Sequence, residues 1–331
     1  MARVISTFEH LIDLASERFG AAVVAANDDF FASKENLIKP GPSRWIEGKY
    51  TDRGKWMDGW ETRRRRDQET YDWCVIRLGA RGLVQGVDVD TTHFTGNFPE
   101  ACAIDVTSGF DEATEWHEVL PRSPLRGDAH NWFAIDRAPA ATHVRLRIFP
   151  DGGVARLRVH GTVVADWPRL KRRGEVDLGA AEHGGIVLST SDMFFGSGHN
   201  LIMPGDATHM GDGWETRRRR GPGHDWAILR LAAAGAIHRI EVDTRHFKGN
   251  APGACSLEYA VEPSVAGAAS PDAETAADAF AWRELMPRTS LEPHRLHTFE
   301  VAPSSDAATH VRFNIFPDGG VGRLRLWGVA R

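Results

Sequence analysis

Two pairs of carboxylates in this 331-residue sequence have the spacing of an acid and a base that share one pocket. Asp58 and Glu61 lie three residues apart in a loop with a glycine, and Asp212 and Glu215 repeat the pair later in the chain. One carboxyl group can protonate a leaving group while the other activates water. In the alternative interpretation, each aspartate caps backbone N–H groups of a turn, and each glutamate neutralises neighbouring arginines.

A run of four arginines follows each pair, at Arg63–Arg66 and at Arg217–Arg220. A guanidinium group binds a carboxylate through two parallel hydrogen bonds, so both runs are candidates for holding a small anion. If each run forms a strand, about half of its side chains point inward. The alternatives are a solvated edge, ion pairing inside the fold, and a nucleic-acid patch, which net acidity and the lack of interleaved aromatic residues disfavour.

Two histidines, His93 and His246, lie in a repeated motif, Val-Asp-Thr-x-His-Phe-x-Gly-Asn, where a strand enters a turn. Functional side chains collect at such strand ends. Asp90 and Asp243, three residues earlier, could orient the imidazole rings, although a lone histidine is more often structural. Asp, Glu and His are suitable ligands for a divalent metal, but no ligand spacing here demands one, so no cofactor is predicted.

All of these residues lie in an internal repeat of the sequence, so the fold of each copy must position them. The nine residues Asp58–Arg66 recur unchanged as Asp212–Arg220, and further matches keep the same order in both halves: Asp28 and Asp192, Gly96-Asn97 and Gly249-Asn250, and Phe149–Gly153 and Phe316–Gly320. The sequence therefore predicts two domains that arose by duplication, residues 1–175 and 176–331. Surface insertions are expected at Lys39–Trp56 in the first copy and Pro263–Ala281 in the second.

The local pattern within each copy is that of strands. Apolar and polar residues alternate in four segments of the first copy: Trp73–Leu78, Gly86–Asp90, Thr142–Phe149 and Val154–His160. A period of two gives each strand one buried and one wet face. With Pro-Asp-Gly-Gly turns and no alternation of strands and helices, the prediction is all-β, with one antiparallel jelly-roll-like β-sandwich per copy. A short amphipathic helix is expected over residues 6–19.

The composition of the chain argues against several classes of function. The formal net charge of −5 argues against nucleic acid or an anionic membrane as a partner. The three cysteines include no CxxC pair, which supports neither a disulfide framework nor a cysteine zinc site. The first twenty residues lack the apolar region of a secretory signal, and no run of about 18 apolar residues follows. The expected location is therefore the cytoplasm.

Several of these motifs together resemble the allantoicase family. They are Asp29–Leu37, Met57–Arg66, Asp90–Asn97 and Phe149–Gly153, and their duplication in the same order extends the resemblance over residues 20–331. The resemblance implies two jelly-roll domains of the galactose-binding-like type. It also implies a homo-oligomeric enzyme that hydrolyses allantoate to ureidoglycolate and urea in purine (ureide) degradation.

Allantoate is a small anion with two ureido groups on one carbon, so arginines should hold its carboxylate. An acid would protonate the departing urea while a base directs water to that carbon. The expected binding residues are Arg63, Arg65, Arg122, Arg217, Arg219 and Arg288. The expected acid and base residues are Asp58, Glu61, His93, Asp212, Glu215 and His246, with the two roles not assigned between them.

The sequence is also compatible with two other classes of function. A non-catalytic tandem β-sandwich could bind a small anion or a sugar through its loops, with Trp60, Trp116 and Trp214 as stacking platforms. A structural scaffold would respond to no ligand. Whether one or both copies form an active site is also open, because Thr92 of the first copy is replaced by Arg245 in the second.

Overall fold

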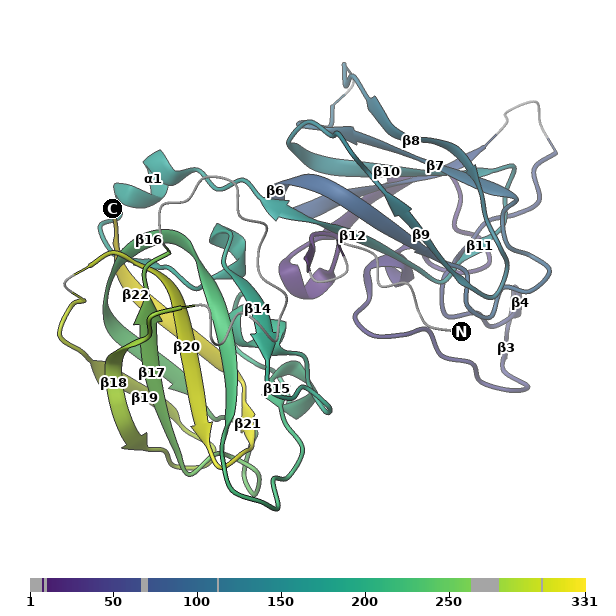
Figure 1. Ribbon diagram of the computed structural model, residues 1–331. Coiled ribbons are helices and arrows are strands. Elements are labelled where there is room, and N and C mark those ends of the chain that lie inside the picture. Colours follow the sequence, from purple (N-terminus) through teal and green to yellow (C-terminus); the bar gives the residue numbers. More distant parts are fainter. Residues whose placement is uncertain (1–7, 9–10, 67–70, 112, 263–279, 305) are drawn as a thin grey trace. The chain divides into compact units, whose positions relative to one another are not determined.

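The computed structural model describes residues 8, 11–66, 71–111, 113–262, 280–304 and 306–331. Within this part of the chain, each copy of the repeat forms one antiparallel β-sandwich (Figure 1), which confirms the predicted fold class. Contacts divide the chain into two units between Ala165 and Asp166, ahead of the predicted boundary at residue 175.

Eight paired strands build the sandwich of the first unit: β1 (Ile12–Asp13), β2 (Ala22–Ala26), β6 (Asp72–Asp90), β7 (Ala101–Thr107), β8 (His117–Pro124), β9 (His130–Ala134), β10 (Ala141–Phe149) and β12 (Arg156–Val163). Two smaller pairings join β3 (Tyr50–Thr51) to β4 (Gly54–Lys55) and β5 (Trp60–Glu61) to β11 (Gly153–Val154). These strands contain the four segments in which the sequence alternates, apart from Ala155, which lies between β11 and β12.

The long strand β6 belongs to both layers of this sandwich. Its first part pairs with β2 and β10, and its second part, from Gly82 onward, pairs with β12 and β9. Between the two parts, Gly79 passes so close to the chain that a Cβ atom there would lie 2.2 Å from the carbonyl oxygen of Phe19. A side chain at residue 79 would therefore force the neighbouring chain of the first unit to shift.

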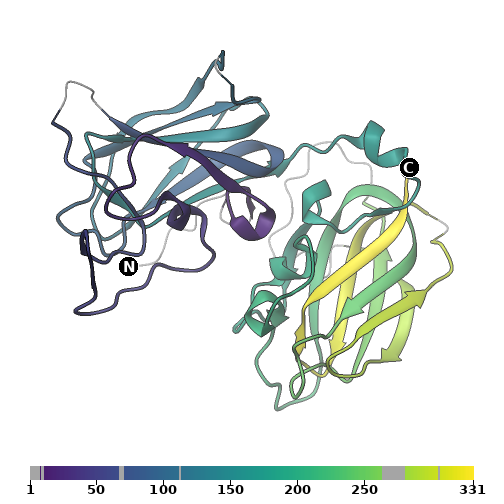
Figure 2. The same cartoon turned by 180° about the vertical axis from the view of Figure 1, so that it is seen from behind.

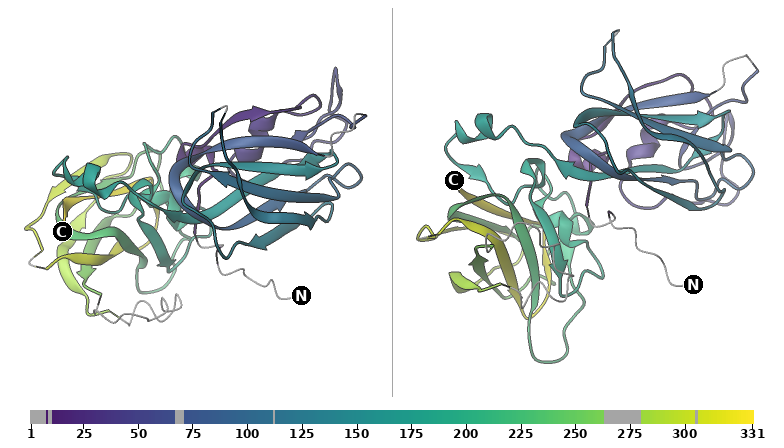
Figure 3. Two further views of the ribbon diagram at one scale, coloured as in Figure 1. Left: turned by 90° about the horizontal axis from the view of Figure 1, so that it is seen from above. Right: turned by 45° about the horizontal axis from the view of Figure 1, so that its top comes forward.

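The second unit repeats this arrangement, as Figures 2 and 3 show from other sides. Its eight paired strands are β13 (Val176–Asp177), β14 (Ile186–Thr190), β16 (Asp225–Asp243), β17 (Ala254–Ala260), β18 (Arg283–Ser290), β19 (Leu296–Glu300), β20 (Ala308–Phe316) and β22 (Arg323–Ala330). A separate pairing joins β15 (Trp214–Glu215) to β21 (Gly320–Val321). Strand β16 takes the place of β6.

Each core follows from the alternation of the strands. Val144, Leu146 and Ile148 of β10 are fully buried, whereas Arg145 and Arg147 lie on the opposite face and share the carboxylate of Asp105. Removing each large apolar side chain from water contributes about 1.5–3 kcal/mol.

Helices are short in the described residues. The α-helix α1 (Trp167–Lys171) begins at Asp166, whose side chain accepts the backbone N–H of Arg169. The 3-10 helices are η1 (Glu17–Phe19), η2 (Lys34–Ile38), η3 (Ala181–His183), η4 (Gly198–Ile202) and η5 (Met210–Asp212). No helix in the described part of the chain is both long and apolar enough to cross a bilayer.

The helix expected over residues 6–19 is not formed in the described part of that segment. Ile12 and Asp13 pair with Gly161 and His160 of β12, so they form strand β1, and only the turn η1 follows. Pairing with a strand far along the sequence overrides the local helical pattern. The expected first insertion is an exposed loop that contains β3 and β4, while most of the second, residues 263–279, lies outside the described residues.

Candidate functional site

Glu61 lies beside a cavity of the first unit because of its place in β5. The preceding residue, Trp60, is fully buried, and its indole N–H donates to the carbonyl of Asp28 at 2.7 Å. Successive side chains of a strand point to opposite faces, so Glu61 faces away from the core. Its backbone is fixed on both sides, by pairing with Gly153 of β11 and with Ala32.

The cavity has a volume of about 630 Å³ and a polar lining of both charges. Three arginines line it, together with three carboxylates and one amide: Arg63, Arg64, Arg66, Glu61, Glu100, Asp151 and Asn97. The guanidinium groups can bind an anion, and the carboxylates and the amide can bind N–H groups. Such a lining suits a small molecule that carries a carboxylate and polar amide groups.

A carboxylate–amide pair is the central feature of this cavity. The side-chain Nδ2 of Asn97 donates to Oε1 of Glu61 at 2.8 Å. Burial raises the pKa of the Glu61 carboxyl above its usual value, and the hydrogen bond from Asn97 offsets this only in part. A carboxyl group with a raised pKa is suited to proton transfer near neutral pH. In the second unit, Asn250 donates to Glu215 in the same way, at 2.6 Å.

The turn that presents Asn97 is pressed against the Pro-Asp-Gly-Gly turn. The backbone N–H of Gly153 donates to the carbonyl of Asn97 at 2.7 Å. A Cβ atom on Gly153 would lie 1.9 Å from the ring of Phe94, and Gly152 has a φ of 136°. Both glycines are therefore needed for this approach. Gly319 and Gly320 of the second unit take the same place against Asn250 and Phe247.

Asp58 is not brought to this cavity. Its Oδ2 accepts from the guanidinium group of Arg156 at 2.8 Å and from the backbone N–H of Arg44 at 2.9 Å. Burial raises the pKa of Asp58, but these bonds outweigh burial and lower it below its usual value. Asp212 lies in the same setting, with Arg323 at 3.3 Å and the backbone N–H of Thr208 at 3.0 Å. The structure thus separates the two carboxylates of each motif.

The arginine runs do not alternate as strands would, because β5 ends at Glu61 and residues 63–66 lie outside any strand. The guanidinium group of Arg65 is paired with the buried carboxylate of Asp72 and donates to the carbonyl of Tyr71 at 3.0 Å. Arg64 and Arg66 line the cavity instead, although the sequence pattern did not select them.

Arg63 lines the cavity, and Asp28 holds its side chain at the Nε atom. Its Nε donates to Oδ2 of Asp28 at 2.6 Å, and its side chain is 63% exposed. In the second unit Arg217 repeats the pairing with Asp192 at 2.8 Å, and Arg219 repeats the ion pair of Arg65, with Asp225.

Arg122 and Arg288 lie on the strands β8 and β18, each above the ring of the phenylalanine that precedes the Pro-Asp-Gly-Gly turn. The distances from guanidinium carbon to ring centre are 4.7 Å to Phe149 and 4.3 Å to Phe316. Neither arginine is among the residues that line the two cavities at the Asn97 and Asn250 turns.

His93 and His246 have positive φ angles of 72° and 73°. The backbone N–H of His93 donates to Oδ1 of Asp128 at 2.8 Å, and its ring lies 5.8 Å from Trp45 of the inserted loop. Asp90 accepts from Thr92 and does not hold the ring of His93. His93 is not among the residues that line the cavity of Glu61.

His246 borders a separate hollow of the second unit, of about 450 Å³. Its backbone N–H donates to Nδ1 of His294 at 2.9 Å, and its Nε2 lies 2.9 Å from the carbonyl of Ala207. Asp243 is paired with Arg245. The same hollow is lined by Lys248 and Asn250, so His246 and the Asn250 turn border one hollow.

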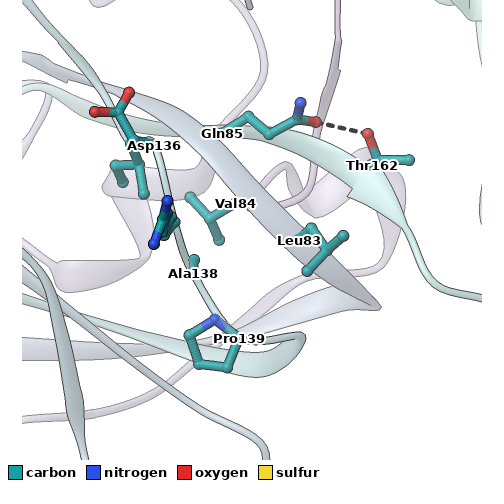
Figure 4. Close-up of a pocket in the computed structure, with 9 residues that line it drawn as sticks. Leu83, Val84, Gln85, Asp136, Ala138, Pro139 and Thr162 are labelled. Atoms are coloured by element: carbon teal, nitrogen blue, oxygen red, sulfur yellow. Dashed lines mark hydrogen bonds between the residues drawn. The ribbon is translucent and has the colours of Figure 1, made fainter. Parts of the chain in front are cut away.

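No group of three or more His, Cys, Asp and Glu side chains in the described ranges is arranged to hold a metal ion. A further hollow of the first unit, of about 510 Å³, is lined by Leu83, Val84, Gln85 and Pro139, with Thr162 donating to Gln85 at 2.6 Å (Figure 4). Asp136 and Arg137 are its charged residues, and it contains none of the repeated motif residues. We assign no chemistry to it.

Fold and site together define an internally duplicated jelly-roll protein in which each copy pairs a glutamate with an asparagine. The model of the allantoicase repeat matches residues 12–164 and 176–331. The chain belongs to the allantoicase family.

Relatives extend over almost the whole chain. A probable allantoicase 1 of Burkholderia mallei is 47% identical over 322 residues, which cover 96% of this chain and 94% of the relative. A probable allantoicase of Photobacterium profundum is 48% identical and covers 97% of both chains. The crystal structure of the allantoicase of Saccharomyces cerevisiae superimposes with a TM-score of 0.82 at 33% identity, covering 98% of this chain and 95% of that one.

Proposed function

We propose that this protein is a hydrolase that cleaves allantoate to ureidoglycolate and urea. The observation that carries the proposal is the similarity to allantoicases over nearly the full length of both chains. The cavity of the first unit supports it, because its lining has the charges that this substrate requires.

Arginines at the cavity bind the carboxylate of the substrate. We assign this role in the first copy to Arg63, Arg64 and Arg66, whose side chains reach the cavity. Arg65 and Arg219, which are paired with Asp72 and Asp225, stabilise the walls of the site instead. Arg217 corresponds to Arg63 and takes its role in the second copy.

Glu61 and Glu215 perform the proton transfers. Water loses a proton and its oxygen bonds to the carbon that bears both ureido groups, as the bond from this carbon to one ureido nitrogen breaks. That nitrogen takes a proton as urea departs. The raised pKa of Glu61 allows its carboxyl group to supply or accept this proton. Asp58 and Asp212 hold buried arginines, and His93 and His246 shape the turns that carry Asn97 and Asn250.

The competing interpretation is a sugar-binding module, which would need free tryptophan rings on which a sugar can stack. Trp60 and Trp214 are fully buried, and Trp116 lies under the guanidinium group of Arg145 at 4.5 Å. We also infer that the protein acts in the cytoplasm as a homo-oligomer and binds neither nucleic acid nor membranes. Its three cysteines are buried free thiols, which is consistent with a reducing compartment.

The direct test is the release of urea from allantoate by the purified protein, with allantoin and ureidoglycolate as control substrates. We expect urea from allantoate alone. Release that survives a chelator supports catalysis by side chains, whereas loss that a divalent ion restores assigns carboxylates or histidines to metal binding. Absence of urea under all conditions contradicts the proposed activity.

A further inference from the structure

We propose that Asn97 and Asn250 are positioning residues, each of which holds the carboxylate of its glutamate in the orientation needed for proton transfer. The proposal rests on the proposed function, because it concerns the groups that would serve that reaction. Neither asparagine was selected from the sequence as a candidate site residue.

The first observation is that the amide engages one carboxylate oxygen only. Nδ2 of Asn97 donates to Oε1 of Glu61, and no other hydrogen bond to this carboxylate is found in the described residues. The amide therefore restrains the carboxylate at Oε1 and leaves Oε2 for water or substrate. A proton-transfer group must stay within hydrogen-bond reach of its target, so this restraint has direct value for catalysis.

The second observation is that both copies keep the pair although their surroundings differ. Asn250 donates to Glu215 at 2.6 Å in the second unit. The neighbouring turn residue is Thr95 in one copy and Lys248 in the other, and the side chain that accepts the histidine N–H changes from Asp128 to His294. The Glu–Asn pair persists through these changes.

The third observation is that backbone contacts, and not the Asn97 side chain, hold this turn in place. The backbone carbonyl of Asn97 accepts from Gly153, and Phe94 packs directly on that glycine. Gly153 is in turn the strand partner of Glu61. The backbone therefore holds the turn in place, and the amide of Asn97 is directed to the carboxylate. The matching frame in the second unit is Asn250, Gly320 and Glu215.

The test compares Asn97→Asp and Asn97→Ala by NMR titration of the Glu61 carboxyl carbon, which needs no turnover. Loss of the donor should raise the pKa of Glu61 by roughly half a unit or more. Asn97→Asp, which keeps the shape but adds a like charge, should raise it further than Asn97→Ala. Thr95→Ala, on the exposed surface of the same turn, is the matched control and should leave the titration unchanged.

Turnover is then measured with the other copy silenced. In the Glu215→Gln background, Asn97→Ala should lower kcat by roughly 10- to 100-fold and move the Glu61 limb of the pH profile to higher pH. Asn250→Ala in the Glu61→Gln background is the reciprocal experiment.

The two proposals fail in different ways. A wild-type protein that releases no urea contradicts the proposed function, while the titration still reports on the pair. If the protein is active but the titration of Glu61 is the same in wild type, Asn97→Ala and Asn97→Asp, the positioning role is wrong. The same conclusion follows if Asn97→Ala lowers turnover without moving the pH profile.

Discussion

The guanidinium group of Arg156 lies 2.8 Å from Oδ2 of Asp58, and both side chains are almost completely buried. Arg156 also donates to the backbone carbonyl of Asp58 at 2.9 Å, so one arginine holds the start of the Asp58–Arg66 motif. The motif combines this internal anchor with Glu61 at the cavity three residues later. The motif has the same length in both copies, and this length both anchors Asp58 and places Glu61 at the cavity.

Replacing Asp58 by asparagine should lower the free energy of unfolding by about 3–5 kcal/mol, because Arg156 would keep a buried charge without its partner. Urea denaturation at pH 7 measures this loss. Asp52→Asn in the exposed loop is the control and should stay within about 0.5 kcal/mol of wild type. An equally small effect of Asp58→Asn would show that the pair does not stabilise the unit.

The Asp58–Arg156 pair should also make the free energy of unfolding depend on pH. Arg156 and the N–H of Arg44 outweigh burial, so the folded pKa of Asp58 lies below its ordinary value of 3.8. A lowered folded pKa gives stability that is present above the ordinary pKa and is lost as pH falls through the folded pKa. The stability difference between wild type and Asp58→Asn should therefore shrink below about pH 3.8. A difference that stays constant on acidification contradicts this assignment.

The contribution of Glu61 to stability should change with pH in the opposite direction to that of Asp58. Burial raises its folded pKa, so the folded protein holds this proton more tightly than the unfolded chain does. The stabilising contribution is present below the ordinary value of 4.5 and is lost as pH rises through the folded pKa. Glu61→Gln should accordingly increase the free energy of unfolding at pH 7 and not at pH 4. The exposed Glu115→Gln is the control, and a loss of stability in Glu61→Gln at pH 7 would contradict the prediction.

The fold was predictable from the sequence to a large extent, because strand alternation is a local signal. Val144, Leu146 and Ile148 recur with a period of two, and the structure places them in the core of β10. Strand β1 was not predictable in this way, since Ile12 and Asp13 pair with residues almost 150 positions further along the chain. Only the tertiary fold brings these segments together.

The candidate site was predictable in part. Glu61 follows a buried tryptophan in a repeated motif, and the structure places it at the cavity. The assumption of strand geometry for residues 63–66 selected Arg65, whereas its partner Asp72 draws it into the wall. Asn97 had a usable signal, because Gly96-Asn97 recurs as Gly249-Asn250. The contact with Glu61 was not visible, because it joins strand β5 to a turn 36 residues further along the chain.

Glu61→Gln and Glu215→Gln should show how many copies act. Because both copies hold the same pair, each single substitution should lower kcat about twofold if the sites are independent. The double substitution should lower it by roughly 10²- to 10⁴-fold, as expected for loss of a general acid or base. Urea release under saturating allantoate measures both. A single substitution that removes all turnover assigns the reaction to that copy, and a double variant with full turnover removes both glutamates from the mechanism.

Three neighbouring arginines should respond differently to removal, although they are adjacent in sequence. Arg64 and Arg66 are exposed at the cavity, so Arg64→Ala and Arg66→Ala, in the Glu215→Gln background, should raise KM by roughly tenfold or more, with changes in stability within about 0.5 kcal/mol. Arg65→Ala removes the cation beside the buried carboxylate of Asp72, which among the described residues keeps only the hydrogen bond from the Asn27 amide, and should cost about 3–5 kcal/mol of unfolding free energy. Steady-state kinetics together with urea denaturation of the three variants separate binding from stability. A stable Arg65→Ala protein with a raised KM, beside an Arg64→Ala protein with normal kinetics, would instead support the strand-like alternation of this run and move the carboxylate-binding role to Arg65.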